Sequence, residues 1–165
     1  MAIAIAIWGY ARTKLYGKRW NIANALLACG MVMAILCITI MGRTTGERIL
    51  VLKPFASLAA ARTQSEAYRE LLMNIFLFFP FGLTLSNALP QSWGRWRRIG
   101  LTVITGLLLS AGIEYIQYRF ALGVAETDDV ICNTLGTFIG STSLLIAHGI
   151  EKYNEKTIKH DSNKN

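Results

Sequence analysis

The chain has 165 residues, of which 53% are hydrophobic and only 16% are charged, with a mean hydropathy of +0.37 and a formal net charge of +7. This composition excludes an ordinary soluble domain, because the charges gather in a few short segments instead of recurring along the chain. Nucleic acid is not an expected partner, since no basic cluster is interleaved with exposed aromatic residues. We therefore predict an all-α, polytopic membrane protein.

Four stretches are long and apolar enough to cross a hydrocarbon layer about 30 Å thick, which takes roughly 20 residues in a helix. We expect a bundle of four transmembrane helices over residues 21–149, with spans at 21–41, 70–89, 99–118 and 130–149, loops at 42–69 and 119–129, and a charged tail at 150–165. Residues 1–20 are too short to add a span. They either lie at the membrane interface or precede a start codon farther along the chain.

Basic residues predict the orientation of the bundle. They gather without acidic neighbours before the first span and between spans two and three, and they recur in the tail. The positive-inside rule places these segments in the cytoplasm, so both termini are cytoplasmic and the loops at 42–69 and 119–129 face outward. The residues concerned are Arg12, Lys14, Lys18, Arg19, Arg95, Arg97, Arg98, Lys152, Lys156, Lys159 and Lys164.

Glu114 is a charged residue inside an otherwise apolar span, where a carboxylate costs a few kcal/mol at the least. Ser110 and Gln117 lie on the same helix face, because they are four and three residues away. At a rise of 1.5 Å per residue, Asn74 and Asn133 reach the same depth as Glu114, roughly 5–10 Å below the outer edge of the hydrocarbon. The sequence therefore predicts a polar site near the outer surface.

The fourth span carries a matching stripe. Asp129, Asn133, Gly136 and Gly140 recur at helical spacing, and the Gly-x-x-x-Gly pair lets a neighbouring helix approach closely. We expect spans three and four to pack together, with Asn74 supplied by span two. The glycine face is also a candidate contact for a homodimer.

Pro80 interrupts the second span. Because proline lacks an N–H group, it removes the hydrogen bond to the Phe76 carbonyl and is expected to kink the helix near its middle. The helix is predicted to start in the capping box Thr63-Gln-Ser-Glu66. A kink would tilt Asn74 toward the other helices.

These motifs together resemble the VanZ-like family of small bacterial membrane proteins, named for a teicoplanin-resistance accessory protein. The resemblance runs from about Leu52 to Gly140. It rests on the order and spacing of Leu52-Lys-Pro54-Phe55, Asn74 with Phe79-Pro80-Phe81-Gly82, Ser110 with Glu114 and Gln117, and Thr127-Asp128-Asp129 with Asn133-Thr-Leu-Gly136. It implies a multi-pass protein of the bacterial cytoplasmic membrane with a role in the cell envelope.

One departure from the family pattern concerns a cation. Many members carry an arginine shortly after the glycine of the third loop, where this chain has Gly123-Val-Ala-Glu126. Arg119 is the nearest basic residue of that loop, and Arg62 and Arg69 in the first outer loop are further candidates for binding an anion.

The first functional hypothesis is an intramembrane enzyme that acts on an envelope lipid or lipid-linked precursor. Apolar surroundings favour the neutral form of Glu114 while Asp129 at the water boundary stays ionised, so the two could divide acid and base roles. Asn74 would assist them. No cofactor is expected, except that Asp128 and Asp129 could hold a divalent cation. Substrate-orienting candidates are Gln117, Asn133, Asp128, Ser110 and Arg119.

The second hypothesis is a protein without chemistry that binds a lipid, an antibiotic or a partner of the envelope machinery. On this reading Asn133 and Gln117 are hydrogen-bonding contacts between helices, Asp128 caps the fourth span, and a neutral Glu114 holds helices together. A transporter is a third hypothesis, for which four spans without an inverted repeat offer little support. Whether the protein is an enzyme is left open.

Overall fold

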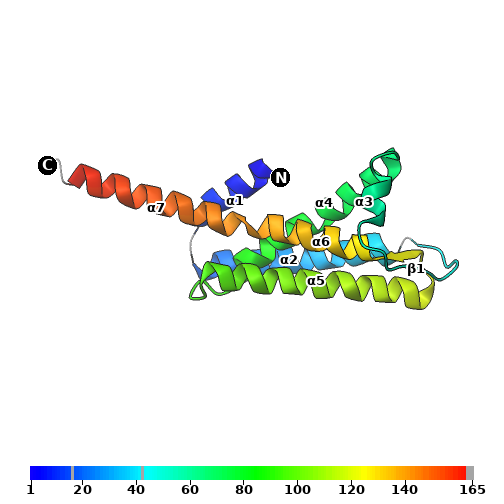
Figure 1. The fold of residues 1–165 in the computed structure, drawn as a ribbon. Helices are drawn as coiled ribbons and strands as arrows, with labels where there is room; N and C mark the ends of the chain where they lie inside the picture. The colour runs from blue at the N-terminus through cyan, green and yellow to red at the C-terminus, as the bar shows by residue number, and fades with distance from the viewer. Residues whose placement is uncertain (16, 42, 163–165) are drawn as a thin grey trace.

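The computed structural model describes residues 1–15, 17–41 and 43–162 (Figure 1). The fold is a helical bundle with one short pair of strands, which confirms the predicted fold class. The elements are α1 (Ala2–Lys14), α2 (Lys18–Leu36) with its π-helical continuation η1 (Cys37–Met41), β1 (Ile49–Val51), α3 (Ala56–Ala60), α4 (Ser65–Ala88), α5 (Arg95–Phe120), β2 (Val124–Glu126), α6 (Thr127–Ser141) and α7 (Ser143–Ser162).

Four helical segments in the described part of the chain are long and apolar enough to cross a membrane, which confirms the predicted number of spans. They are Lys18–Met41, Ser65–Ala88, Arg95–Phe120 and Thr127–Ile150. The fourth combines α6 with the start of α7, and α7 then extends beyond the bundle (Figure 1). The tail predicted at 150–165 is thus helical up to Ser162, and 163–165 lie outside the described residues. The cytoplasmic placement of both termini stays a prediction.

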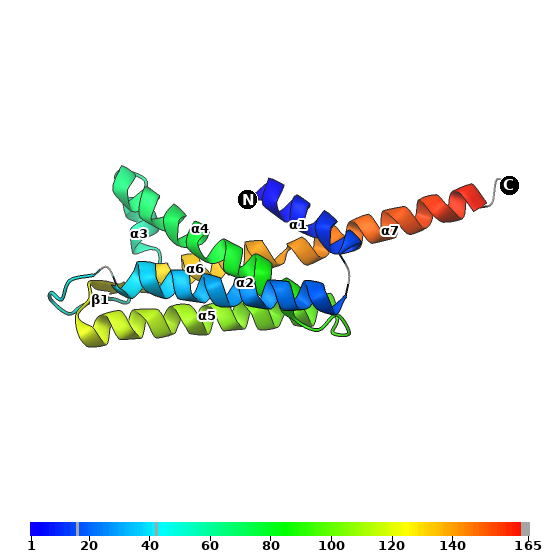
Figure 2. The same ribbon diagram turned by 180° about the vertical axis from the view of Figure 1, so that it is seen from behind.

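The N-terminal segment forms a helix that packs on the bundle. Ile5 of α1 is buried against Phe79 and Leu83 of α4, and α1 runs beside the first turns of α7 (Figure 2). The indole Nε1 of Trp8 donates to Oδ1 of Asn24 at 2.9 Å, which ties α1 to α2. Helix α1 thus packs against α2, α4 and the start of α7.

Two helices, α4 and α6, make the tightest contact in the bundle. A side chain at Gly136 would overlap with the Ile75 carbonyl, and one at Gly140 would overlap with the Phe79 carbonyl. On the other helix, Gly82 of α4 lies equally close to the backbone of α6 at Thr137. Glycine is required on both helices because the two backbones themselves are in contact.

This contact corrects one prediction about the glycine face. Spans three and four do pack together, as predicted, but Gly136 and Gly140 pack against span two, whereas span three meets α6 through a different glycine, Gly106, which lies against the Thr137 side chain. A periodic stripe shows which face of a helix is small but not which neighbour covers it. Within one copy, α4 thus covers Gly136 and Gly140, and the homodimer stays a prediction.

A Gly140→Ala substitution is expected to lower the free energy of unfolding by about 1–2 kcal/mol, because the added methyl would meet the Phe79 carbonyl and the Leu83 nitrogen. The matched control is Gly112→Ala in α5, where a Cβ has nothing within 4 Å and where alanine favours the helix by up to about 1 kcal/mol. Thermal unfolding in detergent measures both. Equal melting temperatures for the two variants would contradict the close α4–α6 contact.

Pro80 lies inside α4, which crosses the bundle obliquely (Figure 1). The hydroxyl of Thr84 donates to the Pro80 carbonyl at 2.8 Å. The predicted capping box is wrong: Gln64 precedes the helix, no side chain caps it, and the Thr63 hydroxyl donates to the Ala60 carbonyl instead.

The two predicted outer loops fold together at one end of the bundle, which we call the strand end. β1 and β2 pair in parallel, with Ile49 opposite Val124 and Val51 opposite Glu126. The short helix α3 follows β1 and leads into α4. This small assembly places residues of both loops beside the first turn of α6.

Candidate functional site

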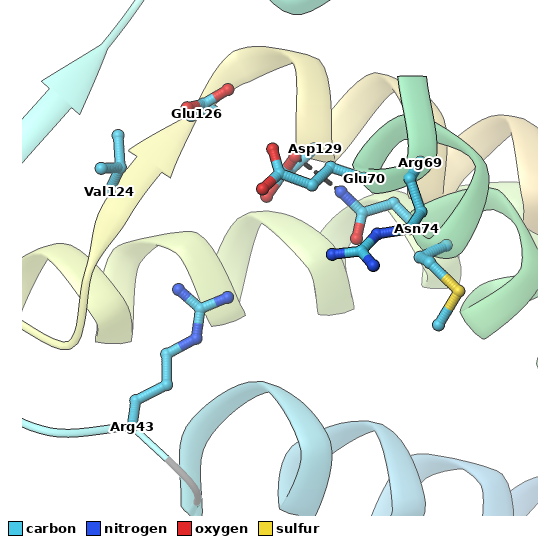
Figure 3. A pocket seen from close by; sticks show the side chains of 8 residues that line it. Arg43, Arg69, Glu70, Asn74, Val124, Glu126 and Asp129 are labelled. Atoms are coloured by element: carbon cyan, nitrogen blue, oxygen red, sulfur yellow. Dashed lines mark hydrogen bonds between the residues drawn. The ribbon is translucent and has the colours of Figure 1, made fainter. Parts of the chain in front are cut away.

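A cavity of about 630 Å³ opens at the strand end of the bundle (Figure 3). Its walls come from the segment after η1, from the first turns of α4, from β2 and from the first turn of α6. The lining residues are Arg43, Arg69, Glu70, Met73, Asn74, Val124, Glu126 and Asp129. Of the residues predicted for the site, the structure thus brings Arg69, Asn74 and Asp129 together in one cavity.

Both signs of charge line this strand-end cavity. Arg43 and Arg69 point their guanidinium groups into it from different segments, and the carboxylates of Glu70, Glu126 and Asp129 lie around the same space (Figure 3). Guanidinium groups match phosphate oxygens in two parallel hydrogen bonds, and carboxylates accept from ammonium groups. The cavity is therefore suited to a ligand that carries a phosphate and an amine.

Asn74 and Asp129 form the inner wall of the cavity. Nδ2 of Asn74 donates to Oδ1 of Asp129 at 2.6 Å, which joins α4 to α6. Asp129 lies in the first turn of α6, where the helix dipole favours a negative charge. The bond fixes one carboxylate oxygen and leaves the other available to a ligand.

Arg43 is a cation of the site that the sequence did not predict, and Glu70, Met73 and Val124 of the cavity wall were not predicted either. Nη1 of Arg43 lies 3.4 Å from the Leu122 carbonyl, and the same group occupies the space that a side chain at Gly123 would need. Gly123 has a φ of +125°, which glycine adopts without strain. Arg43 therefore supplies a cation to the loop in which the family's arginine is absent. Its position directly after the first span was the available signal, since it places Arg43 at the depth of the 119–129 loop.

Asp128 binds the backbone at the start of α3 and does not line the cavity. Its Oδ1 accepts from the backbone N–H of Phe55 at 2.6 Å, and its Oδ2 accepts from that of Ser57 at 2.7 Å. Glu126 accepts a further bond from the Ser57 hydroxyl at 2.7 Å. The prediction that Asp128 caps the fourth span is corrected: it holds the start of α3, while no side chain caps α6.

Glu114 lies next to the cavity but is not among the described residues that line it. The side chain is only 9% exposed, and Oε2 accepts from the backbone N–H of Glu126 at 3.0 Å. It also borders a mostly apolar hollow of about 330 Å³ on the other side of β2, together with Leu50 and Tyr115. Glu114 thus holds the strand that carries Glu126 and Val124 into the site.

Three of the remaining predicted residues, Asn133, Ser110 and Gln117, form hydrogen bonds between helical segments. Nδ2 of Asn133 donates to the Ser110 hydroxyl at 2.9 Å, and Nε2 of Gln117 donates to the Thr39 carbonyl at 3.0 Å. These bonds fit the predicted alternative of interhelical contacts. Arg119 is exposed at the end of α5, with its guanidinium carbon 5.9 Å from the Phe120 ring centroid, and it is not among the described residues of the cavity wall.

The described residues contain no group of three or more His, Cys, Asp or Glu side chains placed to hold a metal ion. Both oxygens of Asp128 already accept backbone N–H groups. A divalent cation shared by Asp128 and Asp129 therefore stays a prediction, for which Asp129 is the only one of the pair on the cavity wall.

Comparison with known proteins identifies the family of the chain. Residues 22–148, which include all the site residues above, match the VanZ/LLP1 family. The chain belongs to this family. It is similar to Protein VanZ of Enterococcus faecium, with 36% identity over 94 residues that make up 57% of this chain and 51% of that protein. The chain thus matches about half the length of that relative, and no solved structure matches it.

Within this VanZ-like bundle, the role of Glu114 is open to a direct test. Glu114→Gln keeps an oxygen that accepts from the Glu126 N–H, so we expect near-normal stability and function. Glu114→Ala leaves that buried N–H unpaired and is expected to lower the free energy of unfolding by about 1–2 kcal/mol. Thermal unfolding is measured on both variants, together with the photo-crosslinking of lipid that is described below. Loss of function in a stably folded Glu114→Gln variant would instead support the predicted acid–base role.

Proposed function

We propose that this VanZ-family protein binds the polar headgroup of a lipid or lipid-linked envelope precursor at the outer face of the bacterial cytoplasmic membrane. The observation that carries the proposal is the strand-end cavity, in which two guanidinium groups and three carboxylates surround one space beside the membrane-spanning helices. By its family, the protein is further proposed to modulate susceptibility to teicoplanin-type glycopeptides, which carry a lipid tail.

A separate apolar hollow of about 270 Å³ lies between α3, α4 and α6. Its residues include Phe55, Leu58, Tyr68, Leu71 and Ile75, and those of α4 lie on the opposite helix face from the residues that line the cavity. Support for a lipid as the ligand therefore comes from the position of the cavity beside the membrane-spanning helices rather than from this hollow.

Asp129 is the residue to which we assign any proton transfer in this site. It faces the cavity and keeps one oxygen free, whereas Glu114 is engaged by the Glu126 backbone and lies outside the described lining. Catalysis on the bound headgroup is the second candidate, and the interhelical bonds of Gln117 and Asn133 favour binding alone because they assign structural roles to two predicted orienting residues.

Photo-crosslinking in cells tests the proposal. A photoreactive amino acid replaces Met73, which is 62% exposed and lines the cavity, and the matched control position is Phe138, an exposed residue of α6 outside the cavity wall. Mass spectrometry of the captured lipids is expected to show a headgroup with phosphate and amine enriched at position 73 over position 138. Equal lipid profiles at the two positions would contradict the proposal.

A further inference from the structure

A second cavity, of about 170 Å³, lies at the opposite end of the bundle, beside the turn that joins α4 to α5. We call it the turn-end cavity. Four separate parts of the chain contribute to it, namely α1, the turn, the first residues of α5 and the start of α7. The lining residues that matter are Arg12, Gln91, Trp93, Arg95, Arg98 and His148.

The charged side chains that line the turn-end cavity are all basic. Three guanidinium groups and one imidazole line it, and none of the lining side chains that the structure describes is acidic. Like charges held this close repel one another unless an anion lies between them. Arg12 is engaged within the protein, since its Nη1 donates to Oδ1 of Asn87 at 3.3 Å, so the charges that matter for a ligand are those of Arg95 and Arg98.

Arg98 is the observation that points to a ligand. The side chain is only 2% exposed, and its Nη2 donates to the Ser86 carbonyl at 2.6 Å. Its Nε is buried and has no hydrogen-bond partner among the described residues. A buried cation with an unsatisfied donor is costly in protein and more so in a membrane, so an anion that accepts from Nε would stabilise this arrangement.

The start of α5 adds further positive electrostatic potential to the turn-end cavity. Arg95 and Arg98 lie in its first turn, which contains no acidic residue, and no side chain caps the helix. The 26-residue helix therefore directs the positive end of its dipole and its free backbone N–H groups at the cavity. Helix starts of this kind bind phosphate groups.

We propose that the turn-end cavity binds a phosphate group, with Arg98 as the buried anchor and Arg95 and His148 beside it. Under the predicted orientation the cavity lies at the cytoplasmic surface, where the phosphate of an anionic phospholipid and free phosphate are the two sources. The proposal does not depend on the function of the strand-end cavity, since the two sites share no residue.

The test compares thermal stabilisation of the full chain in a neutral detergent by three additives. These are dioleoyl phosphatidylglycerol, inorganic phosphate, and dioleoylglycerol, which has the same acyl chains without a phosphate. Phosphatidylglycerol is expected to raise the melting temperature of the unmodified protein by about 4 °C. Arg95→Gln, at an exposed position, is expected to remove most of this rise.

Arg97→Gln is the matched control, because Arg97 is exposed in the same turn but stacks over the Trp93 ring at 4.4 Å instead of lining the cavity. It should keep the full rise. Arg98→Lys, which keeps the charge but removes Nε, should lose part of it. A rise with phosphatidylglycerol alone identifies a lipid phosphate as the ligand, and an equal Arg95-dependent rise with inorganic phosphate identifies free phosphate. A rise with dioleoylglycerol that matches phosphatidylglycerol, or a full rise in both Arg95→Gln and Arg98→Lys, overturns the proposal.

Discussion

Asp129→Asn is expected to weaken binding of an amine-bearing headgroup in the strand-end cavity by about 30-fold or more while the protein stays folded. The loss follows from removing the carboxylate charge, since a hydrogen bond to a charged group contributes about 1.5–3 kcal/mol. The fold is preserved because the new amide oxygen still accepts from Nδ2 of Asn74. The measurement is the yield of headgroup captured from position 73, alongside the melting temperature.

Glu66→Gln is the matched control for this change. Glu66 is exposed in the first turn of α4, near the strand end, but it is not among the described residues that line the cavity. The substitution Glu66→Gln removes one negative charge, as Asp129→Asn does. Capture by this variant should equal that of the unmodified protein. If Asp129→Asn and Glu66→Gln lose capture equally, the cavity attracts the ligand only through overall charge, and Asp129 has no specific contact.

The four spans show what the sequence could predict. Hydrophobic length is a reliable signal because a helix in lipid must satisfy its backbone hydrogen bonds internally and cross a layer of fixed thickness. Depth was predicted from the rise per residue, which placed Asn74 level with Glu114 and Asn133. In the structure Asn74 bonds instead to Asp129, one turn before Asn133, so the rise per residue indicated the region of the site but not the partner.

Residues whose partners come from distant loops could not be predicted in this way. The pairing of β1 with β2 joins segments about 75 residues apart, and Asp128 binds the backbone of α3 across a similar separation. Helical periodicity also shows that Gly136 and Gly140 share a face, but not that α4 rather than α5 covers it. Neighbour choice depends on the packing of the whole bundle, which a single stripe does not encode.

Arg43 supplies a positive charge beside the third loop, at residues 119–129, and its removal is expected to weaken headgroup binding. Arg43→Ala is expected to weaken headgroup binding about 20-fold, because Arg43 projects a guanidinium group into the cavity and a paired phosphate would lose up to two charge-assisted hydrogen bonds. Stability should change little, since the side chain is exposed and its contact with the Leu122 carbonyl is long, at 3.4 Å.

Restoring the cation from the other side of the cavity provides the stricter test. Val124 follows Gly123 and lines the same cavity, so Val124→Arg introduced into the Arg43→Ala protein places a guanidinium group where the family commonly has one. Recovery of at least half of the lost capture is expected. Leu50→Arg in the Arg43→Ala protein is the control, because Leu50 is exposed on the paired strand but borders the apolar hollow beside Glu114. Recovery by both arginines alike would mean that only net charge matters, and recovery by neither would contradict a phosphate contact at this position.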